Sequence, residues 1–184
     1  MSPIDARTYR VEATLRDGGA ICIRAIRPDD KARLLEHFAG LSPQSVYFRF
    51  MGIRRELSER DLKDLTELDF INHVGLVATI TEGGVERLVG VGRYIRGAHP
   101  ERAELAFAIL DKHQGRGIGT LLLEHLNHIA HANGITEFEA NVLGDNTRML
   151  EVFAHSGLKV RRSFESGVVH LYFSTDEPGE SSGE

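Results

Sequence analysis

Glycines cluster at one point of the chain, between an apolar strand-like run and a helical run. Residues 114–119 read Gln-Gly-Arg-Gly-Ile-Gly; they follow the strand-like run 104–110 and precede a helical run that starts at Thr120. A strand that passes through glycines into a helix presents several backbone N–H groups at the positive end of the helix dipole. The segment therefore predicts a binding site for the phosphate or pyrophosphate of a cofactor.

Two familiar glycine-loop chemistries do not fit this segment. A triphosphate-binding loop ends in Gly-Lys-Ser/Thr, but no lysine separates Gly119 from Thr120. The dinucleotide fingerprint has its third glycine three residues after the second, but the glycines here lie at positions 115, 117 and 119. A glycine-rich helix start that binds no ligand stays open as an alternative.

The composition is typical of one globular domain. The chain has 184 residues and is 41% apolar, which is enough for a core, and we expect one domain over residues 1–174. The net charge is −5, from 27 acidic and 22 basic residues, and no run of Lys or Arg suggests a nucleic-acid partner. An acidic surface instead suits an amine-bearing partner.

Several features indicate a cytoplasmic protein. Cys22 is the single cysteine, so no intrachain disulfide forms. The N-terminal segment has no apolar core of signal-peptide length, and no run of eighteen apolar residues suggests a membrane span. Residues 175–184 are acidic and rich in Gly and Ser, so we expect a disordered tail there.

Hydrophobic periodicity and turn residues predict a mixture of hairpins and helices. The expected strands are 8–15, 20–26, 73–81, 88–96, 102–110, 136–142, 158–164 and 168–173, and the expected helices are 28–39, 44–51, 58–68, 120–133 and 146–155.

This order of elements, with the Gln-x-x-Gly-x-Gly arrangement of residues 114–119, resembles the GNAT acyl-CoA-dependent N-acetyltransferases over roughly residues 20–173. The resemblance implies the GNAT fold, an α+β fold with a mixed, mostly antiparallel central sheet flanked by helices. Within the superfamily, residues 41–50, 103–107 and 145–149 are similar to the bacterial protein lysine acetyltransferases often called Pat.

The chemistry of acetyl transfer to an amine explains the need for a base. A lysine ammonium loses its proton in water only near pH ~10.4, so a general base must accept that proton before the amine attacks a thioester. The resemblance places the catalytic glutamate of the family, on the strand before the pyrophosphate loop, at Glu104. We expect Glu104 to be partly buried beside Leu105 and Phe107; a solvated strand carboxylate is the alternative.

The resemblance also implies the contacts of acetyl-CoA, the co-substrate. The main chain of the strand would pair with the pantetheine arm, and a backbone N–H of that strand would polarise the thioester carbonyl. The loop would hold the pyrophosphate, with Arg116 adding charge. The asparagine after the next strand would contact the pantetheine. These residues are Phe107, Ala108, Ile109, Gln114, Gly115, Arg116, Gly117, Ile118, Gly119, Thr120 and Asn146.

Three further features carry less weight. Many GNAT enzymes have a tyrosine seven residues after that asparagine as the acid for the leaving thiolate; here Phe153 cannot donate a proton, which leaves water as the acid. His125, His128 and His131 fan around the helix axis, so we expect no metal site. Cys22 has no neighbouring base and is expected to be a core thiol.

The resemblance predicts transfer of acetyl from acetyl-CoA to the ε-amine of a protein lysine, for example on an acyl-CoA synthetase, by direct attack in a ternary complex with Glu104 as base. A small-molecule amine acetyltransferase and a non-catalytic acyl-CoA-binding module are the alternatives. The sequence does not determine the acceptor, the preferred acyl chain or the oligomeric state.

Overall fold

The structure, a computed structural model, describes residues 2–175. Its strands are β1 (Arg10–Thr14), β2 (Ala20–Ala25), β3 (His73–Glu82), β4 (Val85–Arg96), β5 (Arg102–Ile109), β6 (Glu137–Leu143), β7 (Val160–Glu165) and β8 (Val168–Ser174). Its helices are α1 (Lys31–Ala39), α2 (Pro43–Phe50), α3 (Glu59–Thr66), α4 (Ile118–Ala132) and α5 (Thr147–Ala154).

Hairpins build most of the sheet, as the alternating runs and their glycine turns predict. In residues 2–175 the strands form an eight-stranded sheet in the order β1-β2-β3-β4-β5-β6-β8-β7. Neighbouring strands are antiparallel except for β5 and β6, which run parallel because the connection through α4 crosses over between them. The predicted α+β class with a mixed, mostly antiparallel sheet is confirmed.

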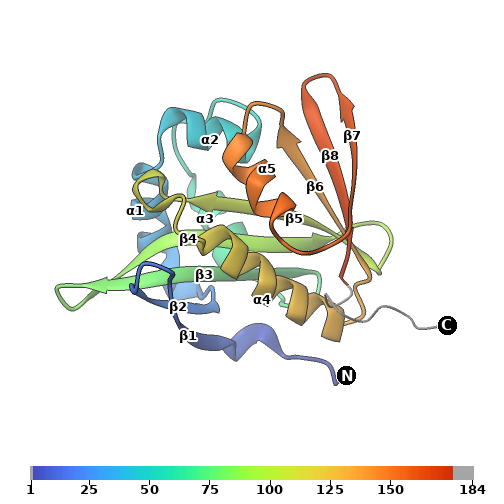
Figure 1. Ribbon diagram of the computed structural model, residues 1–184. Helices are drawn as coiled ribbons and strands as arrows, with labels where there is room; N and C mark the ends of the chain where they lie inside the picture. The colour runs from blue at the N-terminus through green and yellow to red at the C-terminus, as the bar shows by residue number, and fades with distance from the viewer. Residues whose placement is uncertain (1, 176–184) are drawn as a thin grey trace.

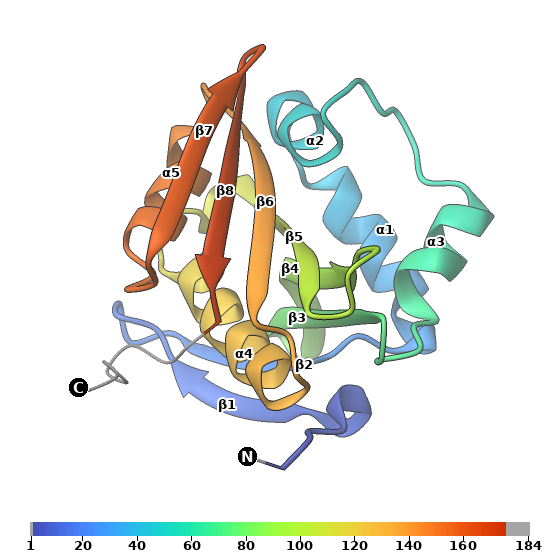
Figure 2. The ribbon, with the colours of Figure 1, turned by 90° about the vertical axis from the view of Figure 1, so that its right-hand side faces the viewer.

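Strands β5 and β6 pair only at their beginnings. Their register partners are Arg102 with Glu137, Ala103 with Phe138, and Glu104 with Glu139. Beyond these pairs β5 continues along β4, while β6 pairs with β8 over its whole length. Figure 2 shows the two strands diverging into a wedge. Residues 105–109 of β5 therefore have no strand partner on the β6 side.

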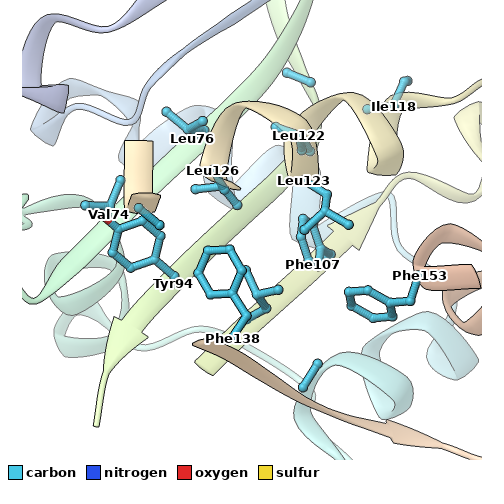
Figure 3. Packing of buried hydrophobic residues seen from close by; sticks show 14 of the residues in the cluster. Val74, Leu76, Tyr94, Phe107, Ile118, Leu122, Leu123, Leu126, Phe138 and Phe153 are labelled. Carbon is cyan, nitrogen blue, oxygen red and sulfur yellow. The ribbon is translucent and has the colours of Figure 1, made fainter. Parts of the chain in front are cut away.

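The two faces of the sheet carry different helices (Figures 1 and 2). Helix α4 covers one face, where its apolar stripe joins the larger core; Leu122 and Leu126 are fully buried there, close to Phe107 and Phe138 (Figure 3). Helices α1 and α3 cover the other face over a smaller cluster, made of Ile26, Leu34, Leu62, Val77, Leu88 and Val91. The sheet thus separates the α4 and α5 side from the α1 to α3 side.

The expected tail begins one residue too early. Thr175 is fully buried; its Oγ1 donates a hydrogen bond to the carbonyl oxygen of Ile135 at 2.5 Å, and its N–H donates to the carbonyl of Thr136. The rest of the predicted tail, residues 176–184, lies outside the described residues. Within residues 2–175, no helix combines the length and apolar character needed to cross a membrane.

Candidate active site

Side chains of β5 alternate between the two faces of the sheet. Leu105, Phe107 and Ile109 are buried against the α4 side, whereas Glu104 and Ala108 face the α1 and α2 side. Glu104 is exposed, so the expected partial burial beside Leu105 and Phe107 is wrong. The physical reason is the period of two along a strand, which places neighbouring side chains on opposite faces.

Backbone groups of β5 alternate in the plane of the sheet. The N–H of Gly97 donates to the carbonyl of Arg102, and the N–H of Leu110 donates to the carbonyl of Val89, so even-numbered residues of β5 bond to β4. The N–H and C=O groups of the odd-numbered residues 105, 107 and 109 consequently point into the wedge. Of the residues expected to pair with the pantetheine arm, Phe107 and Ile109 have their polar groups on the wedge side, where the carbonyl of Ile109 already accepts from Gln114. The polar groups of Ala108 face Val91 on β4. The pairing with pantetheine stays a prediction.

The glycine loop ends in an uncapped helix N-terminus. Gly117 is the N-cap of α4 and adopts φ +85°, and no side chain caps the first turn of this helix. The first backbone N–H that bonds back to Gly117 is that of Leu121. The preceding N–H groups, on Ile118, Gly119 and Thr120, are therefore available to an anion at the positive end of the dipole.

Gly119 also serves packing. A Cβ at this position would lie 3.2 Å from Cγ2 of Val152, so a larger residue here would crowd α5 against the first turn of α4. Further along the same two helices, a cavity of about 290 Å³ lies beside Thr120 and Leu123 of α4 and Ser156 and Leu158 after α5.

Gln114 holds the loop in place. Its Nε2 donates to the carbonyl of Ile109 at 3.1 Å and to Oγ of Ser45 at 3.4 Å, and its Oε1 accepts from Arg148 at 3.1 Å. Asp111 fastens the same region, because its carboxylate accepts hydrogen bonds from Ser42 and Ser45 at the start of α2. The side chain of Gln114 thus links β5, α2 and α5, a positioning role that the spacing alone does not reveal.

Arg116 has protein partners of its own. Its Nε donates to Oδ2 of Asp17 at 2.7 Å, and its NH1 lies 2.7 Å from Nδ1 of His113. The hydrogen bond from Arg116 lowers the pKa of Asp17 below its ordinary value. Arg116 thus ties the loop to the β1–β2 turn; its predicted contact with the pyrophosphate stays a prediction.

Asn146 is the N-cap of α5. Its Oδ1 accepts a hydrogen bond from the backbone N–H of Met149 at 3.3 Å. The oxygen of this side chain therefore serves the helix, and the amide nitrogen is the group left for a ligand.

The structure places the three features that were given less weight. Phe153 is 1% exposed and packs against Phe107 and Phe173, so it is a core residue. Cys22 is buried, and burial raises the pKa of its thiol. His125 contacts the hydroxyl of Tyr9 at 2.6 Å, and residues 2–175 contain no cluster suited to a metal ion.

Four residues at or near the candidate site were not predicted from the sequence. The backbone of Leu105 faces the wedge, Glu139 is the register partner of Glu104, and Arg148 contacts the loop. Arg93 is buried on β4 and lines a pocket together with Ala108 of β5. Arg93 carried a usable signal, because a lone arginine interrupts the apolar run 88–95, whereas the others depend on contacts between distant segments.

The fold and the site define a class of protein. A family model described as the acetyltransferase (GNAT) family matches residues 44–158, which include β5, the glycine loop, α4, β6 and α5. The chain belongs to this family of acetyltransferases.

Three individual proteins of known name are similar to this chain in sequence or structure. The acetyltransferase PA5475 of Pseudomonas aeruginosa is 34% identical over 124 residues, 67% of each chain. The acetyltransferase Pat of Mycolicibacterium smegmatis is 32% identical over 148 residues, which are 80% of this chain and 44% of that longer protein. The crystal structure of the GNAT domain of S. lividans PAT is 39% identical, with a TM-score of 0.81, covering 90% of this chain and 96% of that one. The expected GNAT fold is confirmed.

Proposed function

We propose that the protein transfers the acetyl group of acetyl-CoA to the ε-amine of a lysine on a partner protein. The observation that carries this proposal is the unpaired stretch of β5, which leads into the uncapped N-terminus of α4 and has Glu104 at the apex of the wedge. Membership of the acetyltransferase family supports acetyl-CoA as donor, and the resemblance to the Pat enzymes supports a protein lysine as acceptor.

Acetyl-CoA binds along the wedge. The odd-numbered residues of β5 offer N–H and C=O groups to the amides of the pantetheine arm, as an added strand would use them. The backbone N–H groups from Gly115 to Thr120 hold the pyrophosphate, and the amide nitrogen of Asn146 contacts the pantetheine. A wedge-facing N–H of β5 polarises the thioester carbonyl and stabilises the oxyanion that forms during transfer.

Glu104 is the general base. It accepts a proton from the lysine ammonium, directly or through one water, and the neutral amine attacks the thioester carbon. The new C–N bond forms, the C–S bond breaks, the nitrogen gives its second proton to water, and CoA leaves as a thiolate that takes a proton from water. A thiol with a pKa near 8.5 is an adequate leaving group, so the phenylalanine at position 153 is compatible with turnover.

The acceptor approaches from the α1 to α3 side, because Glu104 points to this face. The resemblance suggests an acyl-CoA synthetase as one such partner. The buried single thiol of Cys22 suits a cytoplasmic location, and we propose that residues 1–174 form one acetyltransferase domain.

The variant Glu104→Gln tests the base, with Glu101→Gln, an exposed glutamate just before β5, as matched control. Acetyl-CoA affinity is measured by calorimetry, and turnover is measured with a bacterial acyl-CoA synthetase as acceptor. We expect kcat of Glu104→Gln to fall by about 10²–10⁴-fold with unchanged affinity for acetyl-CoA, and the control to match wild type. A wild-type rate in Glu104→Gln contradicts the assignment.

The acceptor class is tested separately with labelled acetyl-CoA in a bacterial lysate. We expect acid-stable label on protein lysines. Label found only on small amines contradicts a protein acceptor and leaves the rest of the mechanism standing.

A further inference from the structure

A small pocket lies under the first three helices, on the face of the sheet that bears Glu104. It has a volume of about 30 Å³, and it lies between α1, α2, the segment before α3 and strands β4 and β5. Its walls are mostly apolar, but three basic side chains line it as well: His37, Arg49 and Arg93. Ala108 forms part of the floor, next to the β5 residues proposed to bind the cofactor.

Arg93 is buried there without a carboxylate partner. It is 2% exposed, and its NH1 donates to the carbonyl of Leu65 at 3.3 Å and lies 2.9 Å from Nε2 of His73. No acidic group among residues 2–175 forms an ion pair with Arg93. Burial, and then the nearby charge of Arg49, lowers the pKa of Arg93 to about 9. A buried cation is costly to the fold unless an anion accompanies it.

The second buried arginine of the protein shows what such compensation looks like. Arg24 is also 2% exposed, and its guanidinium donates to both carboxylate oxygens of Asp30 at 2.8 Å and to Glu86 at 2.5 Å. The fold therefore neutralises Arg24 from within and leaves Arg93 without an internal counterion.

His37 adds an unused polar atom to the same pocket. It is 3% exposed, and its Nε2 has no hydrogen-bond partner. Burial lowers the pKa of His37 to about 4, so this imidazole is uncharged at neutral pH and adds polarity, not charge, to the pocket wall. Arg49 brings a further cation; burial lowers its pKa, and the charge of Glu104 opposes that shift.

We propose that this pocket binds the carboxylate of a substrate through the guanidinium of Arg93, with support from Arg49. Its volume exceeds the 10–15 Å³ or so that one water needs, so it admits a group of a few heavy atoms. This inference rests on the proposed function, because Ala108 places the pocket beside the strand assigned to the cofactor. The carboxylate belongs either to the far end of a dicarboxylic acyl-CoA or to the acceptor.

The test compares matched substrates with the wild-type protein. For the donor, succinyl-CoA is compared with neutral pentanoyl-CoA, using Kd and kcat/KM. For the acceptor, a lysine peptide with a neighbouring glutamate is compared with the same peptide carrying glutamine in that place, using acetyl-CoA as donor. We expect at least about a tenfold preference for the charged member of one pair, equivalent to one well-formed ionic hydrogen bond. The pair that discriminates identifies the source of the carboxylate.

Variants localise the effect. Arg93→Met removes the cation at nearly constant length, and Arg87→Met, at a half-buried arginine on the same strand that forms an ion pair with Glu36, is the control. We expect the preference to disappear in Arg93→Met and to persist in Arg87→Met. If Arg93→Met does not fold, the wild-type comparison still decides, because equal treatment of both members in both pairs overturns the inference. If acetyl-CoA itself does not bind, the proposed function fails; if acetyl-CoA is used without any carboxylate preference, only this inference fails.

Discussion

Glu104 on β5 and Glu139 on β6 are the last register partners before the two strands separate. Partners in a parallel pair project to the same face, so two carboxylates stand side by side at the apex of the wedge. In the mechanism proposed above, Glu104 accepts the proton of the lysine ammonium, and we expect Glu139 to attract its charge.

The first prediction concerns Glu139. We expect Glu139→Gln to raise KM for a lysine acceptor several-fold, to lower kcat less than Glu104→Gln does, and to leave the Kd for acetyl-CoA unchanged, since the loss affects attraction and not proton transfer. Steady-state kinetics at low and high salt check this, because screening should reduce the wild-type advantage. An unchanged KM at both salt concentrations argues against the role.

The second prediction separates stability from cofactor binding at the two ends of α4. Gly117 and Gly134 have φ of +85° and +83°, and Ala at either position should cost about 1–2 kcal/mol of folding free energy, measured by urea unfolding. Only Gly117→Ala should also weaken CoA binding, by about tenfold, because its methyl enters the open space in front of the loop N–H groups. Equal CoA affinity in the two variants counts against the pyrophosphate site.

The third prediction concerns the buried ion pair between Arg24 and Asp30. Arg24→Met leaves Asp30, which is fully buried, without its main partner, and we expect a loss of about 3–5 kcal/mol in the free energy of unfolding. Exposed Arg27→Met, which breaks a surface pair with Asp29, should cost less than about 1 kcal/mol. Similar losses in the two variants contradict the assigned importance of burial.

The fourth prediction concerns pH. Burial lowers the pKa of His37 to about 4 from its ordinary 6.5, so in that interval the unfolded chain binds more protons than the folded protein. The stability due to neutral His37 is complete above pH ~6.5 and declines as the pH falls toward 4.

Between pH 7 and pH 5 we expect a loss of roughly 2 kcal/mol from this group. His37→Leu should flatten the pH dependence by that amount, as urea titrations at the two pH values can measure. A pH profile identical to wild type contradicts the shift.

Much of the architecture is readable from the sequence because it depends on local signals. The glycine turn at Asp17 to Gly19 and the cap at Ser58 lie where the structure has a hairpin and the start of α3. The expected start of α4 at Thr120 was two residues late, because Ile118 and Gly119 already belong to the helix. Helix ends set by a left-handed N-cap are hard to read from apolar periodicity alone.

The site was harder to predict than the fold, because much of it depends on contacts between distant segments. The wedge is set by the pairing of β6 with β8, which no local pattern of β5 reveals. Strand alternation determines the face of the sheet to which Glu104 points. The same alternation explains why the expected burial of Glu104 beside Leu105 and Phe107 is wrong. The isolation of Arg93 emerges only when α1, α2 and β4 are in place.

Because β5 and β6 diverge inside the sheet, each of them has an edge without a strand partner on the side of the wedge. Unpaired strand edges favour the addition of strands from other chains and hence aggregation. Without a ligand in the wedge, the inward groups of residues 105–109 present such an edge. Acetyl-CoA bound along these residues, as proposed above, would cover this edge. We therefore expect the bound coenzyme to stabilise the protein as well as to react. The ligand-free protein should then be the species most prone to self-association.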